Sequence, residues 1–591
     1  MKFLALALDY DGTIAVDGVL DQAVRESIAH VRSKGIVVLL VTGRILSELR
    51  QVAGDLHFVD AIVAENGAAL EFTDSGYSRL LGSPPVPELL EELRRRNIRA
   101  SAGECVVEAE ANDAPVLLDI LRTLELPLAL LFNRGRVMML PQAISKASGL
   151  REALKILRLS EHNLVAIGDA ENDHELLQTS ELGVAVGWGS PALKAAADFV
   201  LEGTGPPSVA AYIRELAEHQ QIPSSVKARR NLSLGYTDAG KPFSLAIRGR
   251  TLLVAGDTKS GKSWVAGLLC EQLILYGYSL LIVDPEGDYI SLESLPGVVV
   301  FGGADPLPRP RDLLRSLRHA DISVVIDLSH TSYEEKMEYV RNLLAGVETL
   351  RRHTGLPHQI VLDEAHYFLN DARNGLFDPD LGCYTLVTYR ASFLHPDVLK
   401  CAEAIIVTCE SDPKEIAALH DLCSGCAGSM TESEWADSLK SLVLSEAAVL
   451  PLTAEAGGEV RRIHLAPRLT PHVRHVAKYV DIPIPEKDRF VFWRNGSVSG
   501  QYARTLRQLV ATMERWPASA LQEHLMRNDF SRWIANVFGD YPLSKSVQQL
   551  EDEYKRRQVA DLVLDIIAAI RSRYDFVDPL YTKQAQAVAK G

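Results

Sequence analysis

The stretch FLALALDYDGT at residues 3–13 joins a short apolar run to two carboxylates. The apolar part is continuous and too short for a helix, so it predicts a buried strand of a parallel sheet. In such sheets, reactive groups collect at the carboxyl ends of the strands. Asp9 and Asp11 stand at this end. The first could attack phosphorus, while the second could protonate the leaving oxygen and later activate water.

Similar apolar runs return between amphipathic stretches through most of the first 465 residues. Those at residues 36–41, 163–169 and 183–187 predict further buried strands. After GTGPPS and QQIPSS, near residue 225, a second series follows at residues 250–257, 279–284, 322–327, 358–365 and 404–410. From Gln501 the sequence is helical and aromatic-rich, and no strong strand is expected after residues 490–493. The pattern predicts two α/β domains and a mainly helical third.

Composition restricts the classes of function. The net charge of −15 disfavours non-specific binding of the whole surface to DNA or RNA. Seven cysteines in 591 residues do not form a disulfide scaffold. No stretch approaches the ~20 apolar residues of a membrane span, and the first apolar run is too short for a signal peptide. We therefore expect a soluble cytoplasmic protein.

Three more polar groups accompany the predicted strands of the first domain. Thr42, Gly43 and Arg44 follow the second strand, where a hydroxyl and backbone N–H groups could hold phosphoryl oxygens. Lys146 offers a cation for the phosphate and the nucleophile, and Lys194 is a rival for this role. The run GDAEND at residues 168–173 supplies hard oxygen ligands suited to Mg²⁺. Such an ion would neutralise charge between two anions.

This ordered set resembles the Cof-type phosphatases of the haloacid dehalogenase superfamily over about residues 1–215. ENGA at residues 65–68 and the run at 184–200 also resemble that family. The resemblance implies a Rossmann-like domain over residues 1–225, with a core at 1–83 and 140–225 and a small α/β cap at 84–139. It also implies that Asp9 is the nucleophile, Asp11 the acid/base, and Thr42 and Lys146 the phosphate binders.

The same resemblance implies the metal ligands. These are Asp9, Asp11 through its carbonyl, Asp169 and Asp173, assisted by Asn172. The substrate would be a small phosphorylated metabolite such as phosphoglycolate or a sugar phosphate. Candidates for substrate contacts, by position alone, are Gly43, Arg44, Glu65 and Asn66.

A second phosphate site is predicted at GDTKSGKS, residues 256–263. This GxxxxGK[ST] motif lies between an apolar strand and a helix, the context that the motif requires. Gly256 and Gly261 shape the loop, Lys262 reaches the outer phosphates of ATP, and Ser263 binds Mg²⁺. About 100 residues on, a strand ends in Asp363, expected to anchor Mg²⁺, and Glu364, expected to polarise the attacking water.

Together with DPEGDY at residues 284–289, this set resembles HerA/FtsK-like ATPases over about residues 230–465. The resemblance implies a RecA-like P-loop domain over residues 226–480, followed by a mainly helical domain over 481–591. Two features depart from the family pattern. Only about 30 residues precede the motif, too few for the β-barrel of HerA proteins. A later strand ends in Thr388-Tyr389-Arg390, where a Thr-Gln pair is usual in the family. Arg390 is a candidate γ-phosphate sensor or a structural arginine.

Other signals are weaker. Cys423 and Cys426 form a CxxC that fits a reduced loop better than a zinc site. The basic segments 228–236 and 466–479 fit flanks of the ATPase better than a nucleic-acid surface. In the third domain, His524 and Asp529 could form a site, or Asp529 could cap a helix.

The favoured function is a Mg²⁺-dependent phosphomonoester hydrolase modulated by a domain that binds and hydrolyses ATP, and we expect the chain to form a homo-oligomer. A nucleic-acid motor with an appended phosphatase is one alternative. The net charge of −15 and the lack of room for the β-barrel of HerA proteins disfavour it. A nucleotide-dependent scaffold is the other.

Overall fold

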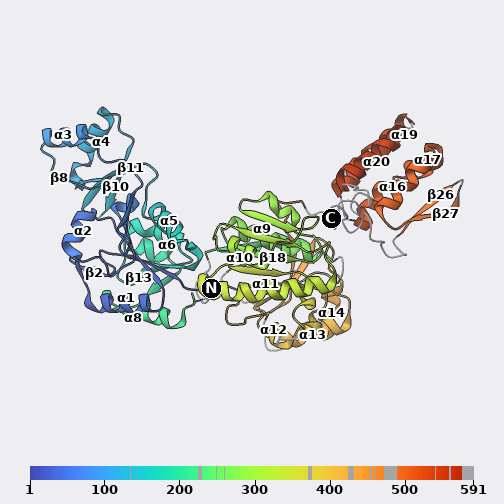
Figure 1. Cartoon of the computed structure of the whole chain (residues 1–591), viewed down its shortest axis with the longest axis horizontal. Helices are drawn as coiled ribbons and strands as arrows, with labels where there is room; N and C mark the ends of the chain where they lie inside the picture. The colour runs from blue at the N-terminus through green and yellow to red at the C-terminus, as the bar shows by residue number, and fades with distance from the viewer. Residues whose placement is uncertain are drawn as a thin grey trace, which may run out of the picture.

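The computed structural model of the protein forms three bodies that follow one another along the chain (Figure 1). It describes residues 1–574 except 134, 224–228, 248, 258–259, 371–375, 424–430, 453–455, 458, 472–488, 495, 539–540, 558 and 560. No helix within this described part is long and apolar enough to cross a membrane.

The first body is built on an eight-stranded sheet of order β14-β13-β12-β1-β4-β5-β6-β7, in which β14 to β5 run parallel. Side chains alternate between its faces. Leu6 and Leu8 of β1 pack toward α1 and α8, whereas Ala5 and Ala7 pack toward α5 and α6. Both faces are therefore buried, as the continuous apolar runs predict. The strands are β1 Ala5–Asp9, β4 Val37–Val41, β5 Ala61–Ala64, β6 Ala69–Phe72, β7 Tyr77–Leu80, β12 Leu164–Gly168, β13 Leu182–Val186 and β14 Phe199–Leu201.

The helices of this body lie on the two faces of that sheet. They are α1 Gln22–Ser33, α2 Leu46–Ala53, α5 Lys146–Leu157, α6 His174–Thr179, α7 Pro191–Ala196 and α8 Pro206–His219. Asp21 caps α1 by accepting from the amides of Ala23 and Val24, and Ser145 caps α5 with a reciprocal bond to Ser148. The cap of α5 fixes where Lys146, its first residue, enters the body.

A small cap stands over the carboxyl ends of this sheet. Its antiparallel sheet has the order β10-β11-β9-β8, and α3 and α4 cover one face. The elements are α3 Pro87–Arg95, β8 Ala100–Ala102, β9 Val107–Glu110, α4 Ala114–Thr123, β10 Leu128–Asn133 and β11 Arg136–Pro141. Strand β11 runs two residues beyond the expected end of the cap at residue 139.

The second body is built on an eleven-stranded sheet of order β16-β15-β25-β24-β23-β17-β22-β21-β18-β20-β19. The strands from β23 to β19 are parallel, and those from β16 to β24 pair antiparallel. The hairpin β15–β16, which precedes the phosphate motif, adds to the edge of this sheet. The strands are β15 Asn231–Thr237, β16 Pro242–Ala246, β17 Leu252–Ala255, β18 Leu280–Asp284, β19 Val298–Gly302, β20 Ser323–Asp327, β21 Gln359–Leu362, β22 Tyr384–Thr388, β23 Ala404–Val407, β24 Glu446–Val449 and β25 Arg461–Leu465.

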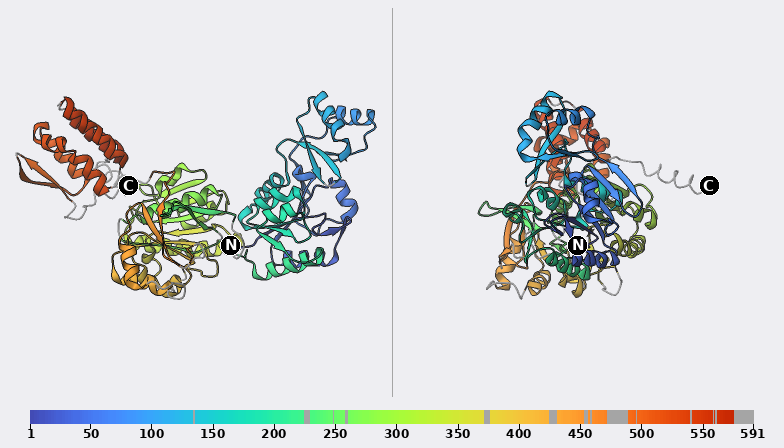
Figure 2. Two further views of the ribbon diagram at one scale, coloured as in Figure 1. Left: turned by 180° about the vertical axis from the view of Figure 1, so that it is seen from behind. Right: turned by 90° about the vertical axis from the view of Figure 1, so that its left-hand side faces the viewer.

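Helices cover both faces of the second sheet (Figures 1 and 2). They are α9 Lys262–Leu275, α10 Pro310–Ser316, α11 Tyr333–Thr354, α12 Pro396–Lys400, α13 Pro413–Cys423 and α14 Glu432–Lys440. Helix α9 is buried over most of its length, which agrees with its apolar sequence.

The third body is mainly helical, as expected, but it also contains a hairpin of β26 Phe490–Arg494 and β27 Ser497–Ala503. The sequence predicts no strong strand after residues 490–493, and β27 is an additional strand that this prediction did not include. Strand β27 is mostly exposed and polar, so it lacks the apolar run on which the prediction relied. The helices are α16 Leu506–Arg515, α17 Ala518–Arg527, α18 Asp529–Trp533, α19 Tyr541–Arg557 and α20 Asp561–Tyr574. The aromatics Phe490, Phe492, Phe530 and Trp533 form its core.

Candidate functional site

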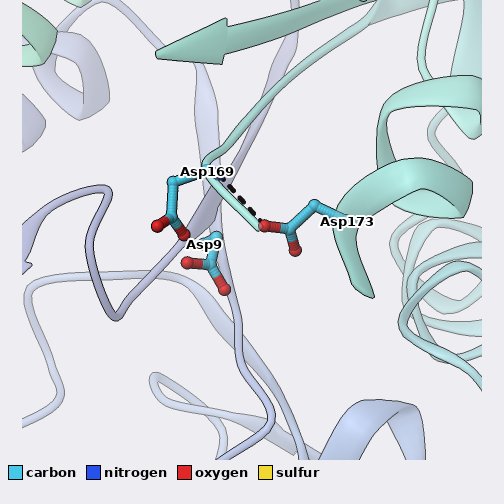
Figure 3. Close-up of side chains that lie close together, drawn as sticks. All are labelled: Asp9, Asp169 and Asp173. Carbon is cyan, nitrogen blue, oxygen red and sulfur yellow. Dashed lines mark hydrogen bonds between the residues drawn. The ribbon is translucent and has the colours of Figure 1, made fainter. Parts of the chain in front are cut away.

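A buried cluster of carboxylates lies at the carboxyl edge of the first sheet (Figure 3). Asp9 ends β1, Asp169 directly follows β12, and Asp173 ends the short turn after it. These three residues are at most 7% exposed, and one oxygen of each lies within 4.8 Å of the others. Lys146 enters from α5, and its Nζ donates to Asp9 Oδ1 and to Asp173 Oδ1, both at 2.6 Å.

Asp173 also shapes the loop that carries Asp169. Its Oδ2 accepts hydrogen bonds from the amides of Asp169 and Ala170, each at 3.1 Å. A Cβ at residue 168 would lie 2.7 Å from the Asp173 carboxyl, so this position requires Gly168. On the other side, Thr13 Oγ1 donates to Asp9 Oδ2 at 3.2 Å. The carboxylates are thus fixed by bonds from three separate segments.

Within the described part of the chain, Lys146 is the cation that contacts Asp9 and Asp173. Burial and the charge of Asp173 raise the pKa of Asp9 well above its usual value, although Lys146 opposes the shift. Burial lowers the pKa of Lys146, but the carboxylates of Asp173 and Asp9 outweigh burial and raise it. Three carboxylates therefore face one ammonium group.

The donor set fits a hard divalent cation. It consists of carboxylate oxygens, which Mg²⁺ prefers. Asn172 adds an amide oxygen that is buried without a hydrogen-bond partner among the described residues. Asp9, Asp169, Asp173 and Asn172 could therefore hold Mg²⁺ together.

A cavity of about 330 Å³ opens from this cluster toward the cap. Thr42, Gly43 and Arg44 line it after β4, and Asp11 lines it beyond β1. Arg44 donates from Nε and Nη2 to the two oxygens of Asp11, both at 2.7 Å. Thr42 Oγ1 accepts from the amide of Arg44 at 3.1 Å. Asp11, which is expected to transfer protons, is thus held by a bidentate contact with Arg44 beside the expected phosphate position.

The cap completes this cavity with residues that the sequence did not single out. They come from the facing strands β9, β10 and β11, and are Glu108, Asn133, Arg136 and Met138. Arg136 Nε donates to Glu108 Oε1 at 2.8 Å. The only sequence signal for them is alternation along the cap strands, which places every second side chain on one face.

Glu65 and Asn66 take another role. They do not line this cavity. Glu65 is fully buried and accepts from the amides of Glu104 and Cys105, each at 2.9 Å. Asn66 Nδ2 lies 2.8 Å from the sulfur of Met138. Both residues thus tie the core to the cap, while Gly43 and Arg44 remain at the cavity wall.

The second candidate site lies between β17 and α9. Gly256 and Gly261 have φ values of 145° and 105°, a region that favours glycine. Lys262 Nζ donates to the carbonyl of Asp257 at 2.8 Å, inside the turn of the loop. Ser263 Oγ donates to Asp288 Oδ2 at 2.6 Å. Thr258 and Lys259 of this motif lie outside the described residues.

Acidic residues from neighbouring strands face this loop. Asp363 directly follows β21, and burial together with the charge of Glu364 raises its pKa well above the usual value. Asp284 ends β18 and accepts from the amides of Glu286, Gly287, Asp288 and Tyr289, which fixes the turn. Burial raises the pKa of Asp284 to about 8. Asp288, held by this turn against Ser263, is a site residue that the sequence prediction omitted.

Arg390 packs on aromatic rings. Its guanidinium carbon lies 5.6 Å from the ring centre of Tyr389 and 5.1 Å from that of Phe393. The neighbouring His366 approaches Thr388 Oγ1 with Nδ1 at 3.0 Å. Burial and the charge of Lys262 lower the pKa of His366 to about 4, so the ring is neutral near pH 7.

Most of the weaker sequence signals resolve into structural contacts. His524 is buried, with Nδ1 2.8 Å from Asp529 Oδ2 and with Nε2 accepting from the amide of Trp493 at 2.9 Å. Both ring nitrogens are thus used inside the third body. Lys194 donates to the carbonyl of Gly187 at 3.1 Å, away from the cavity. Cys423 is buried at the end of α13, and Cys426 and residues 472–479 lie outside the described part of the chain.

Two family models match the chain. The haloacid dehalogenase-like hydrolase family matches residues 6–107 and 129–213, and the central domain of the helicase HerA matches residues 243–368. The second match overlaps the phosphate loop, β18 and β21, and the first overlaps the carboxylate cluster.

Three curated relatives each match about a third of this chain. A phosphoglycolate phosphatase of Methanosarcina acetivorans is 28% identical over 228 residues, which cover 34% of this chain and 92% of that protein. That of Methanopyrus kandleri is 29% identical over 229 residues, covering 36% and 95%. The 5-amino-6-(5-phospho-D-ribitylamino)uracil phosphatase YcsE of Bacillus subtilis is 25% identical, covering 35% and 94%.

Among solved structures, a haloacid dehalogenase-like hydrolase from Bacteroides thetaiotaomicron aligns with a TM-score of 0.32 and 20% identity, covering 36% of this chain and all of that one. The two family matches and the similarity to phosphatases indicate the same kind of protein. The chain is an enzyme that joins a haloacid dehalogenase-like phosphatase domain to an ATPase domain of the HerA type.

Proposed function

We propose that the first domain hydrolyses small phosphomonoesters through a phosphoaspartyl intermediate on Asp9. The observation that carries the proposal is the buried position of Asp9 between Lys146 and the carboxylates of Asp169 and Asp173, at the end of a cavity. Mg²⁺, held by Asp9, the Asp11 carbonyl, Asp169, Asn172 and Asp173, would supply charge neutralisation between nucleophile and phosphate.

The residues of the chain divide the reaction between them. Thr42 and Lys146 bind the phosphoryl oxygens, and Asp9 attacks phosphorus while the P–O bond to the leaving group breaks. Asp11 gives a proton to the leaving oxygen, and it later takes one from the water that hydrolyses the phosphoaspartate. The cap excludes bulk water and supplies Arg136 and Asn133 to the organic part of the substrate.

The substrate class that we propose is a small phosphorylated acid or sugar. Two observations support it. The cavity of about 330 Å³ is small and polar, with Arg44 and Arg136 in its walls. Several relatives are named phosphoglycolate phosphatases. A carboxylate on the substrate would find a charged donor in either arginine.

For the second domain we propose binding and hydrolysis of ATP in a P-loop fold of the RecA-like type. The phosphate loop with Lys262, the hydroxyl of Ser263 beside Asp288, and the carboxyl ends of β18 and β21 support this role. Asp363 would help to hold Mg²⁺, Glu364 would polarise water, and Arg390 would approach the γ-phosphate. ATP would modulate the phosphatase, because the two domains share a buried interface. We further propose a cytoplasmic homo-oligomer.

A second candidate function is action on nucleic acid, which the match to the HerA central domain favours. The ATPase domain would then be a motor on nucleic acid, and the phosphatase domain would remove phosphate groups from nucleic-acid ends. The net charge of −15 counts against a large nucleic-acid surface.

One experiment separates these functions. Phosphate release from 4-nitrophenyl phosphate and from ATP is measured for the wild type, Asp9→Asn and Lys262→Ala, with and without DNA. We expect each substitution to abolish one activity, by at least about 10³-fold, and to spare most of the other. Loss of both activities in Lys262→Ala would indicate one shared site and contradict the proposal. Strong stimulation of ATP hydrolysis by DNA would favour the motor.

A further inference from the structure

The two catalytic domains meet in a buried polar contact. His162 is fully buried, stacks on Tyr278 with ring centres 3.7 Å apart, and approaches Glu181 Oε2 with Nδ1 at 3.0 Å. Tyr278 donates its hydroxyl to the same oxygen of Glu181 at 2.9 Å, and Arg230 approaches it at 2.9 Å. The His162 Nε2 lies 3.0 Å from the carbonyl of Tyr276.

Beside this contact lies a cavity of about 800 Å³ with walls from both domains. One wall is the last part of α5 and the residues after it, and the other is the segment 318–322 together with Ser323, the first residue of β20. The floor includes Tyr278 and the end of α9 at Ile274. Both views show α5 on the side of the first domain that faces the second (Figures 1 and 2).

The charge of this cavity is opposite to that of the protein. Its lining contains four lysines or arginines, at 151, 155, 158 and 318, and two acidic residues, Glu161 and Asp321. The whole chain has 62 lysines and arginines against 77 acidic residues. Arg151 lies 3.4 Å from Glu161. Within the described residues, Lys155, Arg158 and Arg318 have no ion-pair partner.

A helix end explains only part of this charge. Lys155 lies in the last turn of α5, where a cation complements the helix dipole. Arg318 belongs to the other domain and faces the same space, so two independent segments bring positive charge to one cavity. Apolar side chains also line the cavity, among them Leu154, Leu159 and Ile322. The volume lies within the range of small-molecule sites.

We propose that this interdomain cavity binds a small phosphorylated molecule, with Arg158 and Arg318 as the groups that contact its phosphate from the two sides. Planar guanidinium groups suit phosphate oxygens, and the apolar lining suits a ring or a short carbon chain. This site is separate from both catalytic centres. It touches α5, which begins at Lys146, and α9, which begins at Lys262. A ligand here therefore contacts one helix from each active site.

The test measures binding to the full chain by isothermal titration calorimetry in an Asp9→Asn/Lys262→Ala background. The probes are orthophosphate, ADP and 2-phosphoglycolate, which distinguish inorganic, nucleotide and metabolite sources. The cavity variant is Arg158→Glu/Arg318→Glu. The matched control is Arg94→Glu/Arg341→Glu, which also reverses one exposed arginine in each domain, and neither arginine has an ion-pair partner among the described residues. Arg158→Gln/Arg318→Gln is measured as well, so that a folding defect of the reversed pair does not decide the result.

We expect at least one probe to bind at one site per chain with a Kd that rises about tenfold or more in the cavity variant and in its glutamine counterpart. The control pair should keep the Kd of the background within about twofold. Equal affinities of all three probes in the cavity and control variants would overturn the proposal. Because binding is the readout, a failure of the proposed phosphatase function would leave this test unaffected.

Discussion

Asp9 shares the ammonium group of Lys146 with Asp173, at 2.6 Å in each contact. One cation cannot neutralise three buried carboxylates and an incoming phosphate, so the centre needs a further positive charge before an anion can approach. Asp11 stands outside this cluster, in a half-buried position beside Arg44. The proposed nucleophile and the proposed proton donor thus lie two residues apart in different electrostatic surroundings.

The role of Asp11 gives a prediction at this scale. In Asp11→Asn, the first step should survive with 4-nitrophenyl phosphate, because nitrophenolate leaves without a proton, but hydrolysis of the phosphoaspartate should lose its base. We expect a burst of about one nitrophenolate per chain, followed by turnover about 10²–10⁴-fold slower than in the wild type. Rapid-mixing absorbance measures both phases. Equal loss of burst and turnover would show that Asp11 serves only to hold the site together.

At the scale of elements, the two catalytic domains use the same construction. Each places part of its candidate site at the carboxyl end of a central parallel strand, with Asp9 at the end of β1 and the phosphate loop after β17. Each also places a lysine at the first turn of a helix, α5 or α9. The helix must approach the neighbouring turns closely for its lysine to reach the site. In the first domain, a Cβ at residue 149 of α5 would lie 2.5 Å from the Cα of Gly67 and 2.7 Å from its carbonyl oxygen.

Gly149→Ala should therefore displace α5 and with it Lys146. We expect a loss of about 1–3 kcal/mol in the stability of the first domain, as for other overpacked sites, and a fall in hydrolysis of 4-nitrophenyl phosphate. Thermal unfolding and steady-state kinetics provide the measurements. Gly135→Ala is the matched control, since a Cβ there meets nothing within 4 Å. Unchanged activity in Gly149→Ala would mean that α5 can shift without moving its lysine.

A second prediction at this scale concerns Glu551 of α19, a fully buried carboxyl that accepts from the amide of Phe530 at 3.1 Å. Burial raises its pKa to about 7. The folded state therefore keeps a proton between about pH 4.5 and 7 that the unfolded state has lost, so stability falls as pH rises through this window. Hydrogen exchange of residues 529–557 should show a lower opening free energy at pH 8 than at pH 5. Glu551→Gln should remove most of that difference, and a difference that persists would assign it to another group.

Sequence alone could predict the parts of this fold that depend on local pattern. The continuous apolar runs predicted β1, β4, β12, β17 and β18, because both faces of these strands are covered. Strand β27 could not be predicted in this way, because an exposed strand carries no apolar run. The cap residues that line the cavity could not be predicted either, because several cap strands could have supplied them. Asp288 was omitted because its position against Ser263 depends on a turn held by the Asp284 side chain.

At the scale of the whole molecule, the interface between the first two domains lies at the amino ends of the catalytic strands. His162 precedes β12, Tyr278 precedes β18 and His358 precedes β21. At the other ends, Asp169 and Asp363 follow β12 and β21, and Asp284 ends β18. The two active sites therefore open away from the shared contact, and any coupling must pass along strands and helices. Met1 packs against the cores of both domains, which adds an apolar contact to the polar one. Nothing in the sequence of either domain predicts which strand ends meet.

Glu181 is the residue on which this interface depends most. Burial raises its pKa, but the hydrogen bond from His162 and the charges of His162 and Arg230 outweigh burial and hold the pKa below its usual value. The carboxylate is therefore charged and joins three partners, two of which belong to the second domain. Glu181→Ala would remove the carboxylate that the buried His162 and the half-buried Arg230 both contact.

We expect Glu181→Ala to weaken the interface by about 3 kcal/mol, as when one partner of a buried ion pair is removed. In calorimetry the two catalytic domains of the wild type should unfold in one transition, which Glu181→Ala should split into two. Hydrogen exchange of residues 276–280 should rise in the variant. Glu181→Gln, which can still accept from Tyr278, should show a smaller effect, and the exposed Glu202→Ala should show none. A single unchanged transition in Glu181→Ala would mean that the apolar contacts around Met1 hold the domains together and that the polar cluster does not couple them.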